Sequence, residues 1–150
     1  MQIHWIVKKF SELSPFELYL VLQLRNEVFV VEQNCVFQDA DDKDQASFHL
    51  LGFDGNRLVA YTRLVPPQVI YKEASIGRVV TSPSIRGSGA GKELMQQSIK
   101  TAHDLFGIVP IKIGAQLYLK KFYDAFGFCQ VSDTYLEDGI PHIYMLKNPA

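Results

Sequence analysis

The spacing of apolar residues divides the chain into a mixed series of strands and helices. Residues 2–10 alternate loosely between apolar and polar side chains, which predicts a first strand. Ser14, Pro15 and Glu17 then stand where a helix N-cap, its first residue and the third residue of a capping box would be. Apolar residues follow at helical spacing as far as Phe29, so we expect a helix after Ser14.

The middle of the chain carries the signals of a β-hairpin and a further strand. The apolar runs at 47–53 and 57–65 flank Asp54-Gly55-Asn56, a sequence typical of a tight turn. Residues 73–82 read as another strand. Between the first helix and the hairpin, residues 34–46 form an acidic loop.

A second helix is predicted from Gly91 to Phe106, with Gly107 as its stop. One stripe of this helix is apolar, and it consists of Leu94, Met95, Ile99, Ala102, Leu105 and Phe106. Further elements follow as a strand at 108–115, a helix at 116–126 ended by Gly127, and strands at 127–135 and 141–147 around Asp138-Gly139. This order predicts an α/β or α+β fold with a mixed sheet covered by helices on both faces.

Composition narrows the function classes. A chain of 150 residues with 47% hydrophobic and 21% charged residues is typical of one soluble globular domain. A formal charge of −1 gives no general reason to bind nucleic acid or an anionic membrane. No signal-peptide pattern and no apolar run of about 20 residues is present, so we expect a cytoplasmic protein. Cys35 and Cys129 lie far apart and indicate neither a metal site nor a disulfide framework.

The segment 85–94, IRGSGAGKEL, predicts a local anion site at the start of the second helix. Glycines allow backbone N–H groups to curl around a phosphate, and Arg86 and Lys92 add positive charge. A P-loop is excluded because Arg86 and Glu93 replace two of its fixed residues, and neither register fits a dinucleotide fingerprint. An ordinary glycine-rich loop with solvated cations is the competing interpretation.

The run Arg86 to Gly91 satisfies the pattern [RQ]-x-x-G-x-[GA] and, with RVVTSPSIRG before it, resembles the acyl-CoA-binding motif of the GNAT superfamily of N-acyltransferases. The segment KIGAQLYLKKFYDAFGF resembles the second signature of that superfamily, and LQLRNEVFVVEQNCVFQD and EDGIPHIYM resemble its ElaA-type branch. The resemblance covers nearly the whole chain. It implies that 1–150 form one acyl-CoA N-acyltransferase domain, with a mixed, mostly antiparallel sheet of about six to seven strands.

The resemblance also implies where acetyl-CoA would bind and react. Pantetheine would contact the backbone at a strand bulge near Gly77, and Gln116 would contact the cofactor through its amide. Tyr123 aligns with a tyrosine that protonates the departing thiolate, although a core aromatic is the alternative at this position. The full set of implied cofactor contacts is Val79, Val80, Thr81, Arg86, Gly87, Ser88, Gly89, Ala90, Gly91, Lys92, Gln116 and Tyr123.

The general base is not fixed by any motif. Glu32 is the first candidate because it follows an apolar run at the exit of the first helix, and His142 is the second, since a neutral imidazole accepts a proton near pH 7. The remaining candidates are Asp39, Asp41, Glu73, His49 and a water relay. Arg25 is expected to pair with a carboxylate such as Glu32 or to steer an acidic acceptor.

Two functions from different classes fit these residues. The first is an enzyme that transfers an acetyl group from acetyl-CoA to a small-molecule or protein amine without a covalent intermediate. The second is a non-catalytic acyl-CoA-binding sensor or interaction module. We expect no metal, Cys129 in the core and the acidic residues of 34–46 in a solvated loop or attracting a cationic amine. Relatives that pair edge strands also suggest a homodimer.

Overall fold

The first half of the chain builds one antiparallel sheet. The computed structural model describes residues 1–149, and its first sheet has four strands in the order β1-β2-β3-β4. The strands are β1 (His4–Lys9), β2 (Phe48–Asp54), β3 (Arg57–Val65) and β4 (Ser75–Thr81). β2 and β3 form the expected hairpin.

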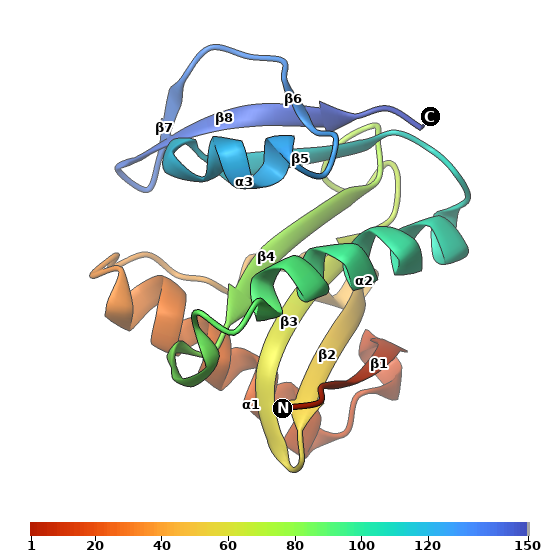
Figure 1. The fold of residues 1–150 in the computed structure, drawn as a ribbon, viewed down its shortest axis with the longest axis vertical. Coiled ribbons are helices and arrows are strands. Elements are labelled where there is room, and N and C mark those ends of the chain that lie inside the picture. Colours follow the sequence, from red (N-terminus) through yellow and green to blue (C-terminus); the bar gives the residue numbers. More distant parts are fainter. Residues whose placement is uncertain (150) are drawn as a thin grey trace.

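The second half builds a separate four-stranded sheet (Figure 1). Its strands are β5 (Ile111–Gln116), β6 (Cys129–Gln130), β7 (Tyr135–Glu137) and β8 (Ile140–Lys147). β5, β6 and β7 all pair with β8 in antiparallel fashion. The two sheets meet at one parallel bridge, where the Lys112 N–H donates to the Ala74 carbonyl oxygen at 2.9 Å. The predicted fold class is confirmed, but the expected single sheet is divided where β4 and β5 diverge.

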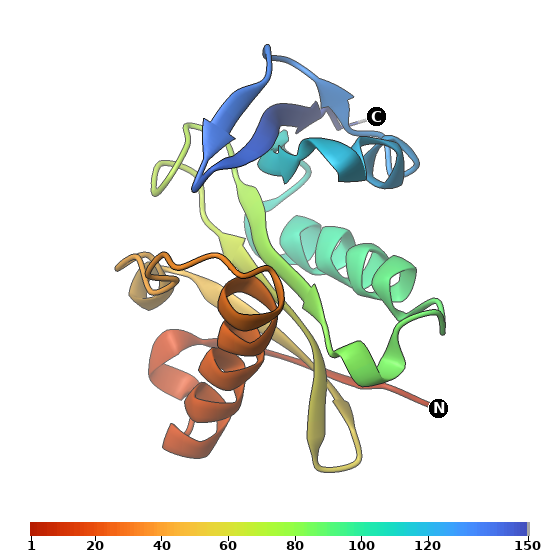
Figure 2. The same ribbon diagram turned by 90° about the vertical axis from the view of Figure 1, so that its left-hand side faces the viewer.

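Helices cover opposite faces of the first sheet (Figure 2). α1 (Pro15–Arg25) starts with the predicted capping box, in which the Glu17 N–H donates to Ser14 Oγ at 3.1 Å and the Ser14 N–H to Glu17 Oε1 at 2.8 Å. It continues as a π-helix over Asn26–Glu32, which the apolar spacing did not indicate. α2 (Ala90–Phe106) lies on the other face and ends at Gly107 as predicted.

Each face of the first sheet has its own apolar core. Leu94, Met95 and Ala102 of α2 are buried with residues from both sheets, and Ile99, Leu105 and Phe106 pack against them, so the predicted stripe is confirmed. Val21 and Leu24 of α1 are buried against the opposite face with Leu51 and Tyr61. Among the described residues, no helix combines the length and apolarity needed to cross a bilayer.

The chain differs from the sequence prediction mainly near its C-terminus. The helix expected over 116–126 is a short 3₁₀ turn at Leu117–Leu119 followed by α3 (Lys120–Asp124). The strand expected over 127–135 is broken into β6 and β7, because the chain leaves the edge of β8 between them. Cys129 was expected in the core, and this is wrong: its side chain lies exposed on the short edge strand β6.

Candidate active site

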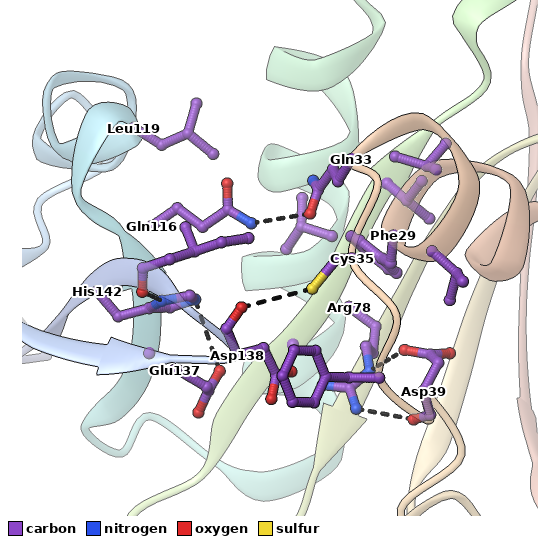
Figure 3. A pocket seen from close by; sticks show the side chains of 18 of the residues that line it. Phe29, Gln33, Cys35, Asp39, Arg78, Gln116, Leu119, Glu137, Asp138 and His142 are labelled. Carbon is purple, nitrogen blue, oxygen red and sulfur yellow. Dashed lines mark hydrogen bonds and ion pairs between the residues drawn. The ribbon is translucent and has the colours of Figure 1, made fainter.

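The diverging sheets leave a cleft of about 820 Å³ between β4 and β5 (Figure 3). Its walls come from both sheets, the π-helix and the loop that follows it. The sequence-predicted site residues that line it are Glu32, Asp39, Asp41, Val79, Val80, Thr81, Arg86, Gln116, Tyr123 and His142. Two other candidate bases, His49 and Glu73, are not among its lining residues.

A bulge in β4 turns backbone groups toward this cleft. Tyr61 of β3 pairs with Val80 and Arg63 pairs with Gly77, so the ladder skips the residues between them. Arg78 occupies the left-handed region, with φ 51°, and relieves the mismatch. A bulge leaves ladder groups of the longer strand unpaired. Backbone N–H and C=O groups of the bulge are therefore available to a ligand, at the place where Gly77 indicated a bulge.

The glycine-rich loop forms a curled entry to α2. Gly87 and Gly89 have φ values of 82° and 83°, and Gly89 is the N-cap of the helix with no side-chain cap. The first helical N–H groups thus keep their capacity to bind an anion. Of the predicted phosphate-binding residues, only Arg86 lines the main cleft. A separate depression is lined by Met1 and by residues of the glycine-rich loop and α2, namely Ser88, Gly89, Ala90, Lys92, Glu93 and Gln96.

Glu32 and Arg86 face each other across the mouth of the cleft. Arg86 Nη2 donates to Glu32 Oε1 at 2.5 Å, and Arg86 Nη1 contacts Glu32 Oε2. The hydrogen bond and charge of Arg86 lower the pKa of Glu32. A carboxylate with a lowered pKa is a weaker proton acceptor, so this pairing disfavours Glu32 as the base. Arg25 pairs with carboxylates, as one of the two expectations for it had it, but its partners are Asp39 and Asp44 and not Glu32.

The acidic loop is held by buried arginines. Arg25 has no exposed surface, and its guanidinium contacts Asp39 Oδ2 at 2.7 Å and Asp44 Oδ1 at 2.8 Å. Arg63 Nη1 lies 2.8 Å from Asp41 Oδ1 and 3.0 Å from Asp44 Oδ1. The expectation of a solvated or amine-attracting loop is therefore wrong for these three aspartates, since arginines already neutralise them.

Arg78 completes this charge network from the β4 bulge. It contacts Asp39 Oδ1 at 2.8 Å and Asp41 Oδ2 at 3.3 Å. Sequence reasoning missed both Arg63 and Arg78. The one available signal was Arg63 itself, since a charged residue within an otherwise apolar strand requires a buried partner. The network fixes the 39–44 segment against β3 and β4 and thereby shapes one wall of the cleft.

The His49 side chain is buried and forms hydrogen bonds that support the fold. Its Nδ1 lies 2.7 Å from the Tyr61 hydroxyl and its Nε2 2.9 Å from the Asp44 carbonyl oxygen. Burial lowers the pKa of this imidazole, and the two hydrogen bonds occupy both ring nitrogens. His49 therefore supports the loop from behind and has no free nitrogen for chemistry.

Tyr123 belongs to both the core and the cleft. Its side chain is 6% exposed and packs edge-to-face against the rings of Phe122 and Phe128. Burial, with a smaller effect of Tyr118, raises the pKa of Tyr123 to about 12. The phenol therefore stays protonated throughout the physiological range, as a hydrogen-bond donor must.

Two contacts join the π-helix exit to the second sheet (Figure 3). Gln116 Nε2 donates to Gln33 Oε1 at 3.3 Å, and Cys35 Sγ donates to the Asp138 carbonyl oxygen at 3.6 Å. Both contacts cross the cleft and join its two walls. Sequence reasoning did not assign Gln33 or Cys35 to this position.

His142 presents one ring nitrogen to the cleft. Its Nδ1 lies 2.7 Å from the Ile140 carbonyl oxygen, which only accepts hydrogen bonds, so Nδ1 carries the proton. Nε2 of the neutral ring then holds the lone pair, and it lies 3.5 Å from Glu137 Oε2. The ring is 7% exposed and stacks on Tyr135 at a centroid distance of 5.9 Å. The stack and the Nδ1 bond fix its orientation.

The described residues contain no cluster of His, Cys, Asp or Glu suited to hold a metal ion. The site combines the buried imidazole of His142, the buried phenol of Tyr123, the bulged strand β4 and the N-terminus of α2. These groups suit proton transfer next to a ligand that combines amide groups with phosphates.

Known proteins resemble this chain in sequence. Residues 21–149 match the model of the acetyltransferase (GNAT) domain. Protein ElaA of Escherichia coli strain K12 is 43% identical over 147 residues, covering 97% of this chain and 96% of ElaA. A UPF0039 protein of Synechocystis has the same identity over the same length.

Solved structures agree with these sequence matches. An acyl-CoA N-acyltransferase from Pseudomonas aeruginosa is 40% identical with a TM-score of 0.93, covering 97% of this chain and 99% of its own. The structure of Escherichia coli ElaA has a TM-score of 0.92 at 42% identity, covering 98% of this chain and all of its own. This chain therefore belongs to the GNAT family of acyltransferases, which take their acyl group from acyl-CoA.

Proposed function

We propose that this chain is an N-acetyltransferase that moves an acetyl group from acetyl-CoA to a primary amine by direct attack, with 1–150 forming a single domain. The observation that carries this proposal is the cleft between β4 and β5. It brings the β4 bulge, the Tyr123 side chain and His142 into one cavity. Direct attack needs these three features together, since the amine loses a proton while the thioester is held and its sulfur leaves.

The cofactor contacts follow the chain from the bulge to the helix. Pantetheine amides bond to the backbone of Val79, Val80 and Thr81, which all line the cleft. The diphosphate rests on N–H groups between Gly87 and Gly91 at the start of α2, where the left-handed glycines curl the backbone. The charged and polar side chains that assist are Arg86, Ser88, Lys92 and Gln116.

We assign the general base to His142. Its Nε2 lone pair faces the cleft, whereas the Glu32 carboxylate is engaged by Arg86. His142 takes the proton as the amine nitrogen bonds to the thioester carbonyl carbon, either directly or through a water molecule. The carbon–sulfur bond then breaks, which gives an amide and the CoA thiolate, and the proton on His142 is released to solvent.

Tyr123 stabilises the leaving sulfur. A thiol has a reference pKa of about 8.5, well below that of the buried phenol. A phenol whose pKa lies well above that of the thiol donates a hydrogen bond to the thiolate while keeping its proton, and solvent protonates the released CoA. The tyrosine thus acts at the reacting atoms even where the proton transfer is incomplete.

The first experiment is release of free thiol from acetyl-CoA with a panel of amines, for the wild type and Tyr123→Phe. We expect amine-dependent release and a loss of about 100-fold or more in kcat for the variant, with CoA affinity unchanged. Tyr19→Phe is the matched control, because Tyr19 is an exposed tyrosine on α1. An unimpaired Tyr123→Phe enzyme would remove this residue from the mechanism.

The same panel separates the enzyme from its alternative. CoA binding without turnover on any amine would favour the non-catalytic acyl-CoA sensor. Propionyl-CoA and longer donors tested beside acetyl-CoA define the acyl group, which this proposal takes to be acetyl.

A further inference from the structure

The carboxylates that line the cleft are neutralised unequally. Glu32 is paired with Arg86, and Asp39 and Asp41 are paired with buried or half-buried arginines. The remaining two, Glu137 and Asp138, form no ion pair with a lysine or arginine of the described chain. The charge that the protein leaves uncompensated in the cleft is therefore negative, and it lies at the β7–β8 turn.

The backbone of this turn has a defined conformation. Asp138 and Gly139 have φ values of 52° and 77°, as a tight hairpin turn between β7 and β8 requires. Cys35 Sγ donates to the Asp138 carbonyl oxygen and ties the turn to the opposite wall. Figure 3 shows Glu137, Asp138 and His142 on one side of the cleft, across from Phe29.

A second, independent observation points to a ligand here. His142 is more than nine-tenths buried, yet within the described structure its Nε2 makes no hydrogen bond and has only the Glu137 carboxylate as an ion-pair neighbour. The Nε2 lone pair and the Glu137 carboxylate oxygen are both acceptors and lie 3.5 Å apart, so a cationic N–H donor is the natural occupant of this position. Apolar Phe29, Phe37 and Ile140 also line the cleft and suit an alkyl chain.

We propose that the acceptor is a diamine or longer polyamine, in which one nitrogen reacts beside His142 while a second, charged nitrogen is held by the Glu137–Asp138 turn. Glu137 and Asp138 are then specificity-determining residues. The inference rests on the proposed amine acetylation and names its substrate class. An α-amino acid is disfavoured because its own carboxylate would enter an acidic site.

The test compares two amines with the same five-carbon chain, 1,5-diaminopentane and pentylamine, with acetyl-CoA as donor. For the wild type we expect a KM for the diamine roughly fivefold or more below that for pentylamine. In Glu137→Gln/Asp138→Asn this ratio is expected to approach one, mainly through a higher KM for the diamine. Asparagine suits the left-handed position of Asp138, so the turn is retained.

The control is Asp133→Asn, an exposed aspartate on the loop between β6 and β7. It removes one negative charge from the same part of the molecule and should leave the ratio unchanged. Raising the salt concentration should reduce the wild-type preference, because exposed carboxylates are screened. Equal use of both amines by the wild type, or an unchanged ratio in the double variant, would overturn the inference.

Calorimetric titration of the diamine into the CoA complex keeps this test separate from the proposed function. Carboxylate-dependent diamine binding without turnover would refute amine acetylation and leave the recognition site standing. Turnover on amines with no preference for the diamine would support amine acetylation and refute the recognition site. No diamine binding and no preference in turnover would reject the inference.

Discussion

Neighbouring charges decide which side chains of the cleft are free to react. Glu32 and His142 both line it and both were candidate bases from the sequence. Glu32 is engaged by the Arg86 guanidinium, whereas a backbone carbonyl fixes the His142 tautomer and leaves Nε2 open. The two also differ in how far away their partners lie in the sequence, since Arg86 is 54 positions from Glu32 and Ile140 only two positions from His142.

Gly89→Val tests the phosphate-binding loop at the residue scale. Gly89 has φ 83° and no atom lies within 4 Å of a Cβ built there, so the substitution meets backbone strain and no collision. We expect a loss of about 1–2 kcal/mol in the free energy of unfolding and a fall of at least tenfold in CoA affinity. Calorimetric titration with CoA measures the affinity, and urea denaturation measures the stability.

Gly55→Val is the matched control for this loop. Gly55 has φ 62° and equally open surroundings, but it lies in the β2–β3 turn away from the cleft. It should lose similar stability and keep its CoA affinity. Equal CoA affinity in both variants would contradict the role assigned to the helix N-terminus.

At the scale of elements, the 39–44 segment is the part whose environment could not be predicted from the sequence. A run of acidic residues with no apolar pattern reads as a solvated loop, yet its carboxylates contact arginines from α1, β3 and β4. Burial alone would raise the pKa of Asp41, but Arg63, with a smaller contribution from Arg78, lowers it to about 2. Burial would also raise the pKa of Asp44, but Arg25 and Arg63 lower it.

These lowered pKa values predict an acid-sensitive contribution to stability. A carboxylate with a folded pKa below its unfolded value stabilises the fold fully above the unfolded value of 3.8, and this stabilisation is lost as pH falls toward about 2. Asp41→Asn should cost about 1–2 kcal/mol at pH 7, less than a fully buried pair because the side chain is 31% exposed. Between pH 4 and pH 2 the variant should lose less stability than the wild type.

Urea denaturation across this pH range measures the difference. Asp42→Asn is the control, since Asp42 is an exposed neighbour with φ 63°, where asparagine is equally suited. It should follow the wild-type curve. Parallel curves for wild type and Asp41→Asn would show that the ion pair contributes no pH-dependent stability.

At the scale of the whole molecule, the sequence predicted what short-range contacts determine. The Ser14 capping box, the Gly107 helix end and the β2–β3 turn each depend on residues a few positions apart, and all three are present. The ion pair of Arg86 with Glu32 joins residues 54 positions apart, and Cys35 lies 103 positions from its partner Asp138. No local pattern encodes such contacts. The split between β4 and β5, which creates the cleft, is equally a property of the assembled sheets.

A ligand that spans the cleft should therefore stabilise the molecule as a whole. The two sheets share one parallel bridge beside the cleft, and the proposed CoA contacts lie on β4, α2 and Gln116 of β5. Binding to the folded state alone adds about 2.7 kcal/mol at a ligand concentration 100 times Kd. For a chain of 150 residues, this corresponds to a rise in Tm of roughly 5–10 °C.

Calorimetric melting with and without CoA measures this shift. The wild type should show it at 100 times its measured Kd. Gly89→Val at the same CoA concentration should show about half of it or less, because a tenfold weaker affinity leaves about 1.4 kcal/mol of stabilisation. A second comparison uses 3′,5′-ADP, which carries phosphates but no pantetheine. If CoA contacts β4 and β5 as well as the α2 loop, it should bind more tightly than 3′,5′-ADP and therefore raise Tm more at the same ligand concentration. Equal effects of both ligands would confine the stabilising contacts to the α2 loop and contradict a ligand that spans β4 and β5.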